Sequence, residues 1–500
     1  MNNPLKAIKT YKLKSSYFTA WLLILGLLSL YILLTVSLLM KNPPVWPDEA
    51  IYAASFKTIT GTILPVSELK VVPDWAGLLA ISHSAFFYLL KTWFSFVPFS
   101  IFFQRLLSSI AGLFFLVAYF WFLRLQGKKS SHFFLDLVIA FSLMVDAIFL
   151  SATRISRPEI FVLFFGFLSL CFYIQAMRII KKNTLFVVLI SAAGFFSGIS
   201  FMIHFFGLFF FVAICIDTLS QNTIHLFKSK EFKLFILGFL VPVVVWFYHF
   251  HSHIAYLQEL LTLSAVRKSV DKTWLWWVFQ HGPVATQLTH LFYVSVSIFF
   301  LIYILLRHKK EYYFVGVLLI LTFLFTSLGK THWYFVYVIP FVYVCLKILL
   351  TQLTNRGIRR GVFLALGVLI LLNLRESYLL TSIVYGSYSY KKYGDALQKI
   401  IPEKSTIFLS AIPDPYFVLM SSKKQYRLYE FPALPTRIEN YRRVLNESNY
   451  IVYTGSYEEM LFNSTLKDYI KSNAAQIIKV GYQDQYQAFV IKLKDYKDRK

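Results

Sequence analysis

Two adjacent carboxylates, Asp48 and Glu49, are the first residues in the chain whose types and spacing suggest chemistry. They follow an apolar run from Tyr17 to Met40, which is long enough to cross a membrane. A carboxylate at a membrane surface can take a proton from an incoming hydroxyl or amine, so we predict Asp48 and Glu49 as catalytic residues. The alternative is structural: Asp48 could instead cap a helix whose apolar side includes Ile51.

Basic residues on the same predicted side of the membrane suit the phosphate of a lipid-linked substrate. A prenyl-phosphate donor needs cations that hold its phosphate and stabilise the leaving group as negative charge develops. The candidates are Arg154, Arg157, Lys330, Arg267 and Lys268. For the first two arginines the alternative is solvation or an ion pair with Asp146 or Glu159. For Arg267 and Lys268 the alternative is contact with lipid headgroups.

Histidines offer a weaker case for chemistry. His83 and His332 are predicted on the same side as the carboxylate pair, where either could orient a substrate. His249, His251 and His253 have a spacing that could bind a metal ion, but such clusters without an acidic or thiolate ligand nearby are more often interfacial. We therefore predict no metal site, leave a divalent metal open as the alternative, and predict no other cofactor.

The composition is that of a membrane protein. Of the 500 residues, 57% are hydrophobic and only 15% are charged, whereas charged residues make up about 25% of an average soluble chain. The net charge of +25 would suggest nucleic acid in a soluble protein, but here apolar runs of span length recur between the charges, so nucleic acid is excluded as a partner. All three cysteines lie inside apolar runs, which excludes a disulfide framework.

Apolar runs of span length predict about eleven transmembrane helices. They fall at 17–40, 101–123, 133–150, 160–177, 185–203, 205–220, 234–250, 291–306, 312–328, 332–350 and 361–382. Lysine and arginine are concentrated in every second loop, which places the N-terminus in the cytoplasm and, with an odd count, the C-terminus outside. The long outer loops 41–98 and 251–290 mix aromatic, apolar and charged residues as interfacial helices do. The C-terminal end carries no retention signal, which favours a bacterial inner membrane.

The chain changes character after the last apolar run. Residues 1–384 form the predicted transmembrane domain, whereas residues 385–500 have the charge content of a soluble, extracytoplasmic domain. In this tail, β-rich runs at 406–410, 426–430, 450–454, 476–480 and 488–493 are separated by helix-length segments at 391–401, 435–447 and 456–473. Strands that alternate with helices predict a small α/β domain with a mainly parallel sheet.

Several segments resemble a known family of membrane enzymes. Residues 46–53, which read Trp-Pro-Asp-Glu-Ala-Ile-Tyr-Ala, are similar to the Pro-Asp-Glu-x-x-Tyr-Ala signature of the GT-C fold membrane glycosyltransferases. This family includes protein O-mannosyltransferases and bacterial lipid A aminoarabinose transferases. A looser resemblance extends through 83–90, 103–108, 152–159 and 329–334. It implies a GT-C-like helical fold, a second acidic site at Glu159, and substrate-orienting roles for four residues. These are Tyr52, His83, Tyr88 and His332.

Together these features predict a glycosyltransferase of the cell envelope. It would move a sugar from a polyprenyl-phosphate-linked donor to an acceptor glycolipid, polymer or protein on the outer face of the membrane, by one inverting displacement with Asp48 as base. The alternatives are a transporter or flippase of lipid-linked sugars and a non-catalytic subunit of a glycosylation assembly. Transporters usually contain internal repeats, and none is visible in this sequence.

Overall fold

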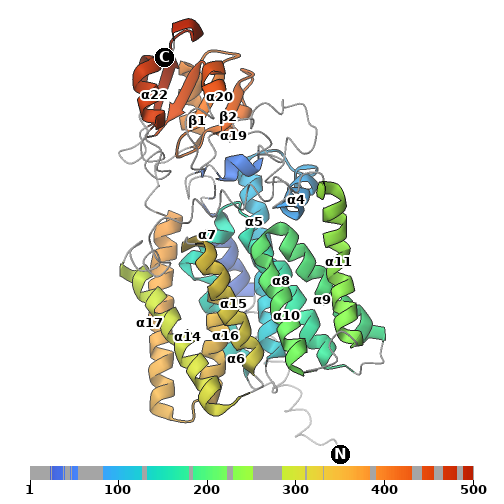
Figure 1. Ribbon diagram of the computed structural model, residues 1–500. Helices are drawn as coiled ribbons and strands as arrows, with labels where there is room; N and C mark the ends of the chain where they lie inside the picture. Colours follow the sequence, from blue (N-terminus) through green and yellow to red (C-terminus); the bar gives the residue numbers. More distant parts are fainter. Residues whose placement is uncertain are drawn as a thin grey trace, which may run out of the picture.

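The computed structural model describes most of the chain as two parts, a bundle of long helices and a small domain with a β-sheet at one end of it (Figure 1). The sheet domain is formed by the last part of the chain, coloured orange to red. The residues described are 23, 25–37, 39, 45, 46, 48–53, 83–126, 132–179, 184–221, 229–251, 284–309, 312–329, 332–382, 390–430, 442–454, 465–480 and 488–498.

Seven helical segments of the bundle are long and apolar enough to cross a membrane, counted over the described residues. Six of them belong to α5 (Ile101–Leu125), α8 (Glu159–Met177), α9 (Thr184–Ile203), α11 (Lys230–Phe250), α14 (Val284–Arg307) and α17 (Arg356–Ser382). The seventh, Tyr334–Gln352, begins in the 3₁₀ helix η7 (His332–Tyr337) and continues through α16 (Ile339–Gln352). Shorter apolar helices cover Leu25–Val36, Phe205–Ser220 and Tyr313–Ser327. Each of these helices overlaps a predicted apolar run, so the predicted multi-pass helical architecture is confirmed.

The predicted span 133–150 is not one straight helix. It forms α6 (Phe133–Met144) and α7 (Ala147–Arg154), which meet at an angle of 62°. Asp146 starts α7 as a separate helix, because its Oδ1 accepts hydrogen bonds from the backbone N–H groups of Ile148 (3.0 Å) and Phe149 (3.1 Å). With this bent pair taken as one span, the described residues contain up to eight spans, and the predicted count of eleven is not confirmed.

Close helix contacts in one half of the bundle depend on small residues. α8 packs against both α5 and α9, and α9 packs against α11 (Figure 1). A Cβ added at Gly194 of α9 would lie 2.0 Å from the backbone oxygen of Phe235, and one added at Gly238 of α11 would lie 2.1 Å from that of Ser191. Glycine therefore lets these two helix backbones approach closely, as small residues do in other membrane helix pairs.

The segment before α5 contains a short helix at the sheet-domain end of the bundle. This helix, α4 (Ser84–Phe94), buries one face against the bundle and exposes Tyr88 on the other. The turn that follows carries Phe96, whose side chain is 81% exposed. Both features fit the prediction of interfacial helices in loop 41–98. Most of the second predicted interfacial loop, 251–290, lies outside the described residues.

The C-terminal domain contains a five-stranded sheet with the order β2-β1-β3-β5-β4. Its strands are β1 (Thr406–Ser410), β2 (Arg427–Glu430), β3 (Tyr450–Tyr453), β4 (Ala474–Val480) and β5 (Ala488–Leu493). β1 pairs in parallel with β2 and β3, whereas β5 pairs antiparallel with β3 and β4. The predicted α/β domain is confirmed, but its sheet is mixed rather than mainly parallel. Only residues 481–487 join β4 to β5, which is too short for a crossover helix.

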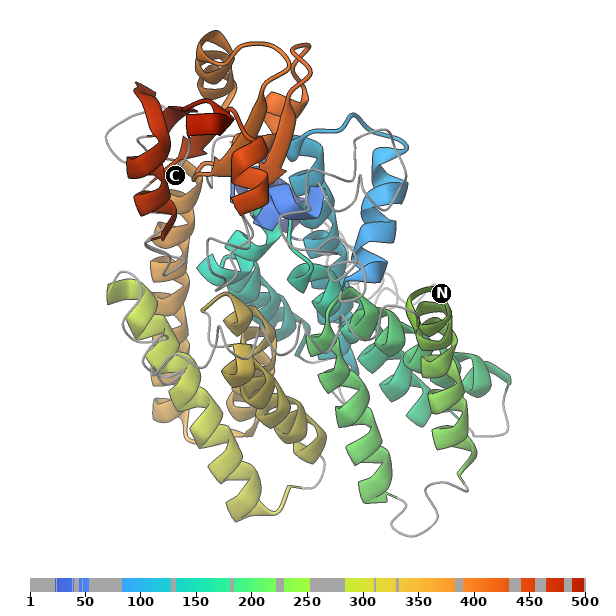
Figure 2. The same cartoon turned by 45° about the horizontal axis from the view of Figure 1, so that its top comes forward.

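Helices cover both faces of this sheet. α20 (Arg442–Glu447) and α22 (Thr465–Asn473) contribute to the hydrophobic core on one face. On the other face, α18 (Tyr390–Ile400) and α19 (Tyr416–Met420) share one continuous core with the helical bundle. A hydrogen bond from the backbone N–H of Asp414 to the oxygen of Val45 (2.8 Å) also joins the two parts. Figure 2 shows the short blue helix that follows Val45 beneath the orange strands at this junction.

Candidate active site

Residues 48–53 form a short helix, and the side chain of Glu49 caps its start. The backbone N–H of Trp46 donates to Oε2 of Glu49 (3.1 Å), which is the glutamate half of a capping box. The structural alternative would require the side chain of Asp48 to cap this helix. The cap is instead provided by Glu49. The side chain of Asp48 remains 42% exposed at the surface of the bundle.

Glu49 points into the protein and forms a buried ion pair with Arg105 of α5. Both side chains are 0% exposed, and the Glu49 oxygens accept from Nε (2.8 Å) and Nη2 (2.6 Å) of Arg105. Oε1 of Glu49 also accepts from the backbone N–H of Ser156 (2.9 Å). Glu49 thus connects the short helix, α5 and the loop between α7 and α8. Its oxygens are fully engaged within the protein, so its position suits a structural role.

Asp48, Arg157 and Glu159 lie together at the same junction. Nη1 of Arg157 lies 3.0 Å from Oδ2 of Asp48, and Nη2 lies 2.9 Å from Oε1 of Glu159. Arg157 is 18% exposed and Glu159 is buried at the start of α8, where the helix dipole favours a carboxylate. Burial disfavours the charge of Arg157, but the carboxylates of Glu159 and Asp48 outweigh burial and raise the pKa of Arg157 well above its ordinary value. The guanidinium is therefore a fixed cation between two carboxylates, of which Asp48 is the accessible one.

A row of aromatic rings lies beside these charges. Tyr52, one helical turn after Asp48, has its ring 5.5 Å from that of His83, and His83 has its ring 5.1 Å from that of His204. The ring of His204 in turn lies 5.9 Å from that of Tyr334. Burial raises the pKa of Tyr52 well above its ordinary value, so its hydroxyl stays protonated and can donate a hydrogen bond. These rings form a wall that could contact the substrate next to Asp48.

Arg154 lies in a different environment from Arg157. It is buried, and its Nη1 donates to the backbone oxygens of Leu34 (2.6 Å), Thr35 (3.0 Å) and Ser37 (2.9 Å). These carbonyl groups lie at the C-terminal end of the helix Leu25–Val36, where a cation is stabilising. The position of Arg154 therefore suits a cap for the first helix of the bundle.

The structure brings together only some of the predicted site residues. Asp48, Tyr52, His83, Arg157 and Glu159 form the cluster, whereas Tyr88 is exposed on α4. Lys330, Arg267, Lys268 and the side chain of His332 lie outside the described residues. The sequence analysis assigned no role to Arg105 or His204. A charged residue inside an apolar run is itself a signal of function or of a buried partner, and Arg105 carries that signal.

Divalent metals in proteins are commonly held by three or more His, Cys, Asp or Glu side chains. No group of three His, Cys, Asp or Glu side chains in the described ranges could hold one. The two carboxylates that approach each other, Asp48 and Glu159, are bridged by the guanidinium of Arg157. Of the three clustered histidines, His251 is exposed, with Nδ1 3.0 Å from the backbone oxygen of Tyr248, and His253 lies outside the described residues.

Comparison with known proteins finds relatives by structure and not by sequence. No protein-family model matches the chain, and no curated protein sequence matches it. The structure of ArnT, the aminoarabinose transferase of Cupriavidus metallidurans, bound to undecaprenyl phosphate matches with a TM-score of 0.59 and 12% identity. This match covers 96% of this chain and 99% of ArnT.

Two structures of an archaeal oligosaccharyltransferase from Archaeoglobus fulgidus also match. The complex of this enzyme, AglB, with an inhibitory peptide and a dolichol-phosphate has a TM-score of 0.57 and 10% identity, over 96% of this chain and 75% of AglB. Its complex with Zn and sulfate has a TM-score of 0.57 and 11% identity, over 93% of this chain and 72% of the enzyme. At such low identity the likeness establishes the fold: the chain is a multi-pass membrane protein with the GT-C fold of membrane glycosyltransferases.

Proposed function

We propose that the chain is a glycosyltransferase that moves a sugar from a polyprenyl-phosphate-linked donor to an acceptor at the outer face of the membrane. The observation that carries this proposal is the exposed carboxylate of Asp48 on a GT-C fold, paired with Arg157, which Glu159 holds in turn. Two proteins with this fold are described with undecaprenyl phosphate and dolichol-phosphate bound, which supports a lipid phosphate as the donor carrier here.

In this mechanism Asp48 is the general base. Its carboxylate accepts the proton of the acceptor hydroxyl or amine as the acceptor oxygen or nitrogen bonds to the anomeric carbon. The bond from that carbon to the phosphate oxygen breaks at the same time, and polyprenyl phosphate leaves with the bonding electron pair. One displacement inverts the configuration at the anomeric carbon. General base assistance of this kind typically accelerates a reaction by about 10²–10⁴-fold.

In this proposal Arg157 binds the donor phosphate and holds the catalytic base, Asp48, at the same time. A guanidinium has five N–H groups, so it can hold both carboxylates and also donate to a phosphate oxygen. Glu159 keeps the guanidinium in place because it is buried and bound to Arg157 from the opposite side. Lys330, Arg267 and Lys268 remain predicted phosphate contacts. We assign structural roles to Glu49 and Arg154. Glu49 holds the short helix against α5, and Arg154 caps the helix Leu25–Val36.

The aromatic wall is proposed to orient the substrate. Tyr52 is one turn from Asp48, and the rings of His83 and His204 continue the row away from it. Aromatic rings and protonated hydroxyls suit a sugar, which has both apolar faces and hydroxyl groups. The substrate-orienting roles of Tyr88 and His332 remain predictions from the sequence.

The cellular setting follows from the loop charges. The alternation of lysine- and arginine-rich loops supports a cytoplasmic N-terminus and an outer C-terminal domain, with the site on the outer side. We propose the bacterial inner membrane as the location. The acceptor is a glycolipid, a polymer or a protein that presents a hydroxyl or amine at this surface.

The test is mass spectrometry of envelope glycolipids, polymers and proteins from cells with the wild-type gene, without it, and with Asp48→Asn. We expect a sugar mass increment that disappears on deletion and falls at least about a hundredfold in initial rate with Asp48→Asn, because an amide cannot accept the proton. Asp495→Asn, a matched change at an exposed position of the C-terminal domain, should behave as wild type. An inserted Asp48→Asn protein with normal transfer would remove the basis for this active site.

A further inference from the structure

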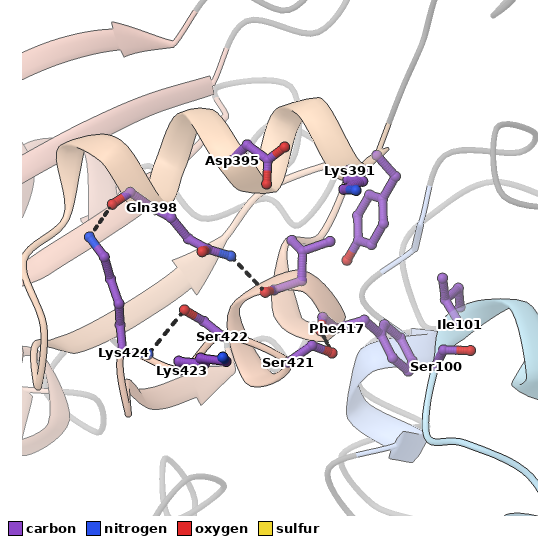
Figure 3. A pocket seen from close by; sticks show the side chains of 12 residues that line it. Ser100, Ile101, Lys391, Asp395, Gln398, Phe417, Ser421, Ser422, Lys423 and Lys424 are labelled. Atoms are coloured by element: carbon purple, nitrogen blue, oxygen red, sulfur yellow. Dashed lines mark hydrogen bonds between the residues drawn. The ribbon is translucent and has the colours of Figure 1, made fainter.

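A cavity of about 530 Å³ lies between the C-terminal domain and the bundle, apart from the Asp48 cluster. One wall is α18, with Lys391 and Asp395, and the opposite wall is the end of α19 and the turn after it, with Lys423. Figure 3 shows these walls, with Ser100 and Ile101 at the start of α5 closing one end. The cavity is therefore formed jointly by the two parts of the protein.

The charges in this cavity favour an anion. Three lysines and one aspartate line it. Lys424 is held in place, because its Nζ donates to the backbone oxygens of Gln398 and Ile401 (3.2 Å) at the end of α18. Lys391 and Lys423 are exposed and have no ion pair with another residue of the described ranges. Their ammonium groups are thus available to a bound group that carries negative charge.

The remaining lining suits a ligand that is polar at one end and apolar at the other. Hydroxyl groups come from Ser100 and Ser422, whose oxygens accept from the backbone N–H groups of Phe103 and Lys424 and whose hydrogens can donate to a ligand. The hydroxyl of Ser421, which also lines the cavity, donates to the backbone oxygen of Phe417 (2.7 Å). Apolar surface comes from Phe417 and Ile101. Ammonium and hydroxyl donors together suit phosphate oxygens, whereas the apolar side chains suit the first carbons of a glycerol or acyl chain.

The position of the cavity indicates that its ligand arrives from the membrane. One end of the cavity is closed by the first residue of α5, a helix long and apolar enough to span the membrane, so the cavity lies where this helix meets the C-terminal domain. The exposed ring of Phe96 lies four residues before Ser100, where an aromatic side chain suits the membrane interface. A phosphate-bearing headgroup at this depth reaches the lysines without leaving the bilayer.

We propose that this cavity binds the phosphate-bearing headgroup of an anionic membrane lipid. That this lipid is the acceptor glycolipid is a further step, which rests on the proposed function. The cavity and the helix at 48–53 are linked by two hydrogen bonds. The hydroxyl of Tyr390, which lines the cavity, donates to the oxygen of Asp414 (2.6 Å), and the N–H of Asp414 donates to the oxygen of Val45 (2.8 Å). A headgroup held here would contact the part of the C-terminal domain that bonds to Val45, three residues before Asp48.

Native mass spectrometry of the full-length protein in detergent tests the binding. The probes are phosphatidic acid and, as a zwitterionic control, phosphatidylcholine with the same acyl chains. Near a membrane surface each lysine contributes on the order of fivefold in affinity, so Lys391→Gln with Lys423→Gln should weaken phosphatidic acid binding about 30-fold. The matched control is Lys479→Gln with Lys492→Gln, two exposed lysines on β4 and β5. Equal binding by both double variants would overturn the proposal.

Two further measurements separate the possible sources of the phosphate and the role of the lipid. Excess inorganic phosphate should leave phosphatidic acid bound, and displacement would mean that the cavity takes free anions and not a lipid. In the envelope assay, the Lys391 and Lys423 double variant should lower the sugar increment while Asp48 is intact. Weaker lipid binding with an unchanged increment would refute the acceptor assignment and leave the proposed function standing.

Discussion

Replacing Glu49 by Gln should destabilise the protein far more than the same amide substitution at the adjacent Asp48. The Oε1 atom of Glu49 accepts from Nε of Arg105 (2.8 Å) and from the N–H of Ser156 (2.9 Å). The Oε2 atom accepts from Nη2 of Arg105 (2.6 Å) and from the N–H of Trp46 (3.1 Å). A glutamine must place its NH₂ group against one of these pairs of donors, whichever way the amide is turned.

The magnitude follows from burial. Both side chains of the Glu49 and Arg105 pair are fully buried, so the substitution leaves the guanidinium charge without a counter-ion away from water. Breaking a buried pair in this way costs about 3–5 kcal/mol, a large part of the roughly 5–15 kcal/mol by which folded domains are stable. Asp48 is 42% exposed, and its pair with Arg157 contributes about 1 kcal/mol or less.

The assay is thermal unfolding of the purified variants in detergent, followed by size-exclusion chromatography of the heated samples. Glu49→Gln should lose its folded peak at a temperature clearly below wild type, whereas Asp48→Asn should remain close to wild type in stability and transfer at least about a hundredfold more slowly. Combining Glu49→Gln with Arg105→Gln should recover part of the loss, because no buried charge is then unpaired. A Glu49→Gln protein as stable as Asp48→Asn would refute the structural role that we give to Glu49.

Three other predictions test separate parts of the molecule. Arg157→Lys should lose most transfer activity with normal folding, because an ammonium cannot hold Asp48, Glu159 and a phosphate in the geometry of a planar guanidinium. An Arg157→Lys protein with wild-type apparent affinity for the donor would show that the phosphate binds elsewhere. Reporter fusions after Lys310 and after Lys500 should give cytoplasmic and outer signals, and the same side for both would show that the span count has the wrong parity. Gly194→Ala should destabilise the α9 and α11 contact by about 1–3 kcal/mol in unfolding measurements, since its Cβ would lie 2.0 Å from a backbone oxygen; unchanged stability would argue against that close approach.

The C-terminal domain is more closely tied to the site than its composition predicts. Residues 385–500 read as a separate soluble domain, yet Trp46 packs against its core and the N–H of Asp414 donates to the oxygen of Val45, just before the helix at 48–53. The side of the sheet covered by α18 and α19 continues into the core of the bundle. This domain therefore helps to fix the position of the segment that carries Asp48.

Properties that depend on local sequence were predictable from the sequence alone. The helical membrane class follows from apolar runs of span length, and the five strands of the tail lie close to the β-rich runs, because hydrophobic periodicity and turn residues act over short distances. The sequence also indicates Asp48 and Glu49 as the start of a possible site, because two adjacent carboxylates in the loop that follows a membrane-spanning run can act on a substrate at the membrane surface.

The roles of the charged residues were decided only by tertiary structure. Asp48 and Glu49 are neighbours of the same charge, and the sequence offers no reason to separate them. The fold does, because successive helical residues point in different directions: Glu49 meets Arg105 in the interior and Asp48 meets Arg157 at the surface. Each partner lies more than fifty residues away in the chain, and such long-range contacts depend on how the helices pack, which no local pattern encodes.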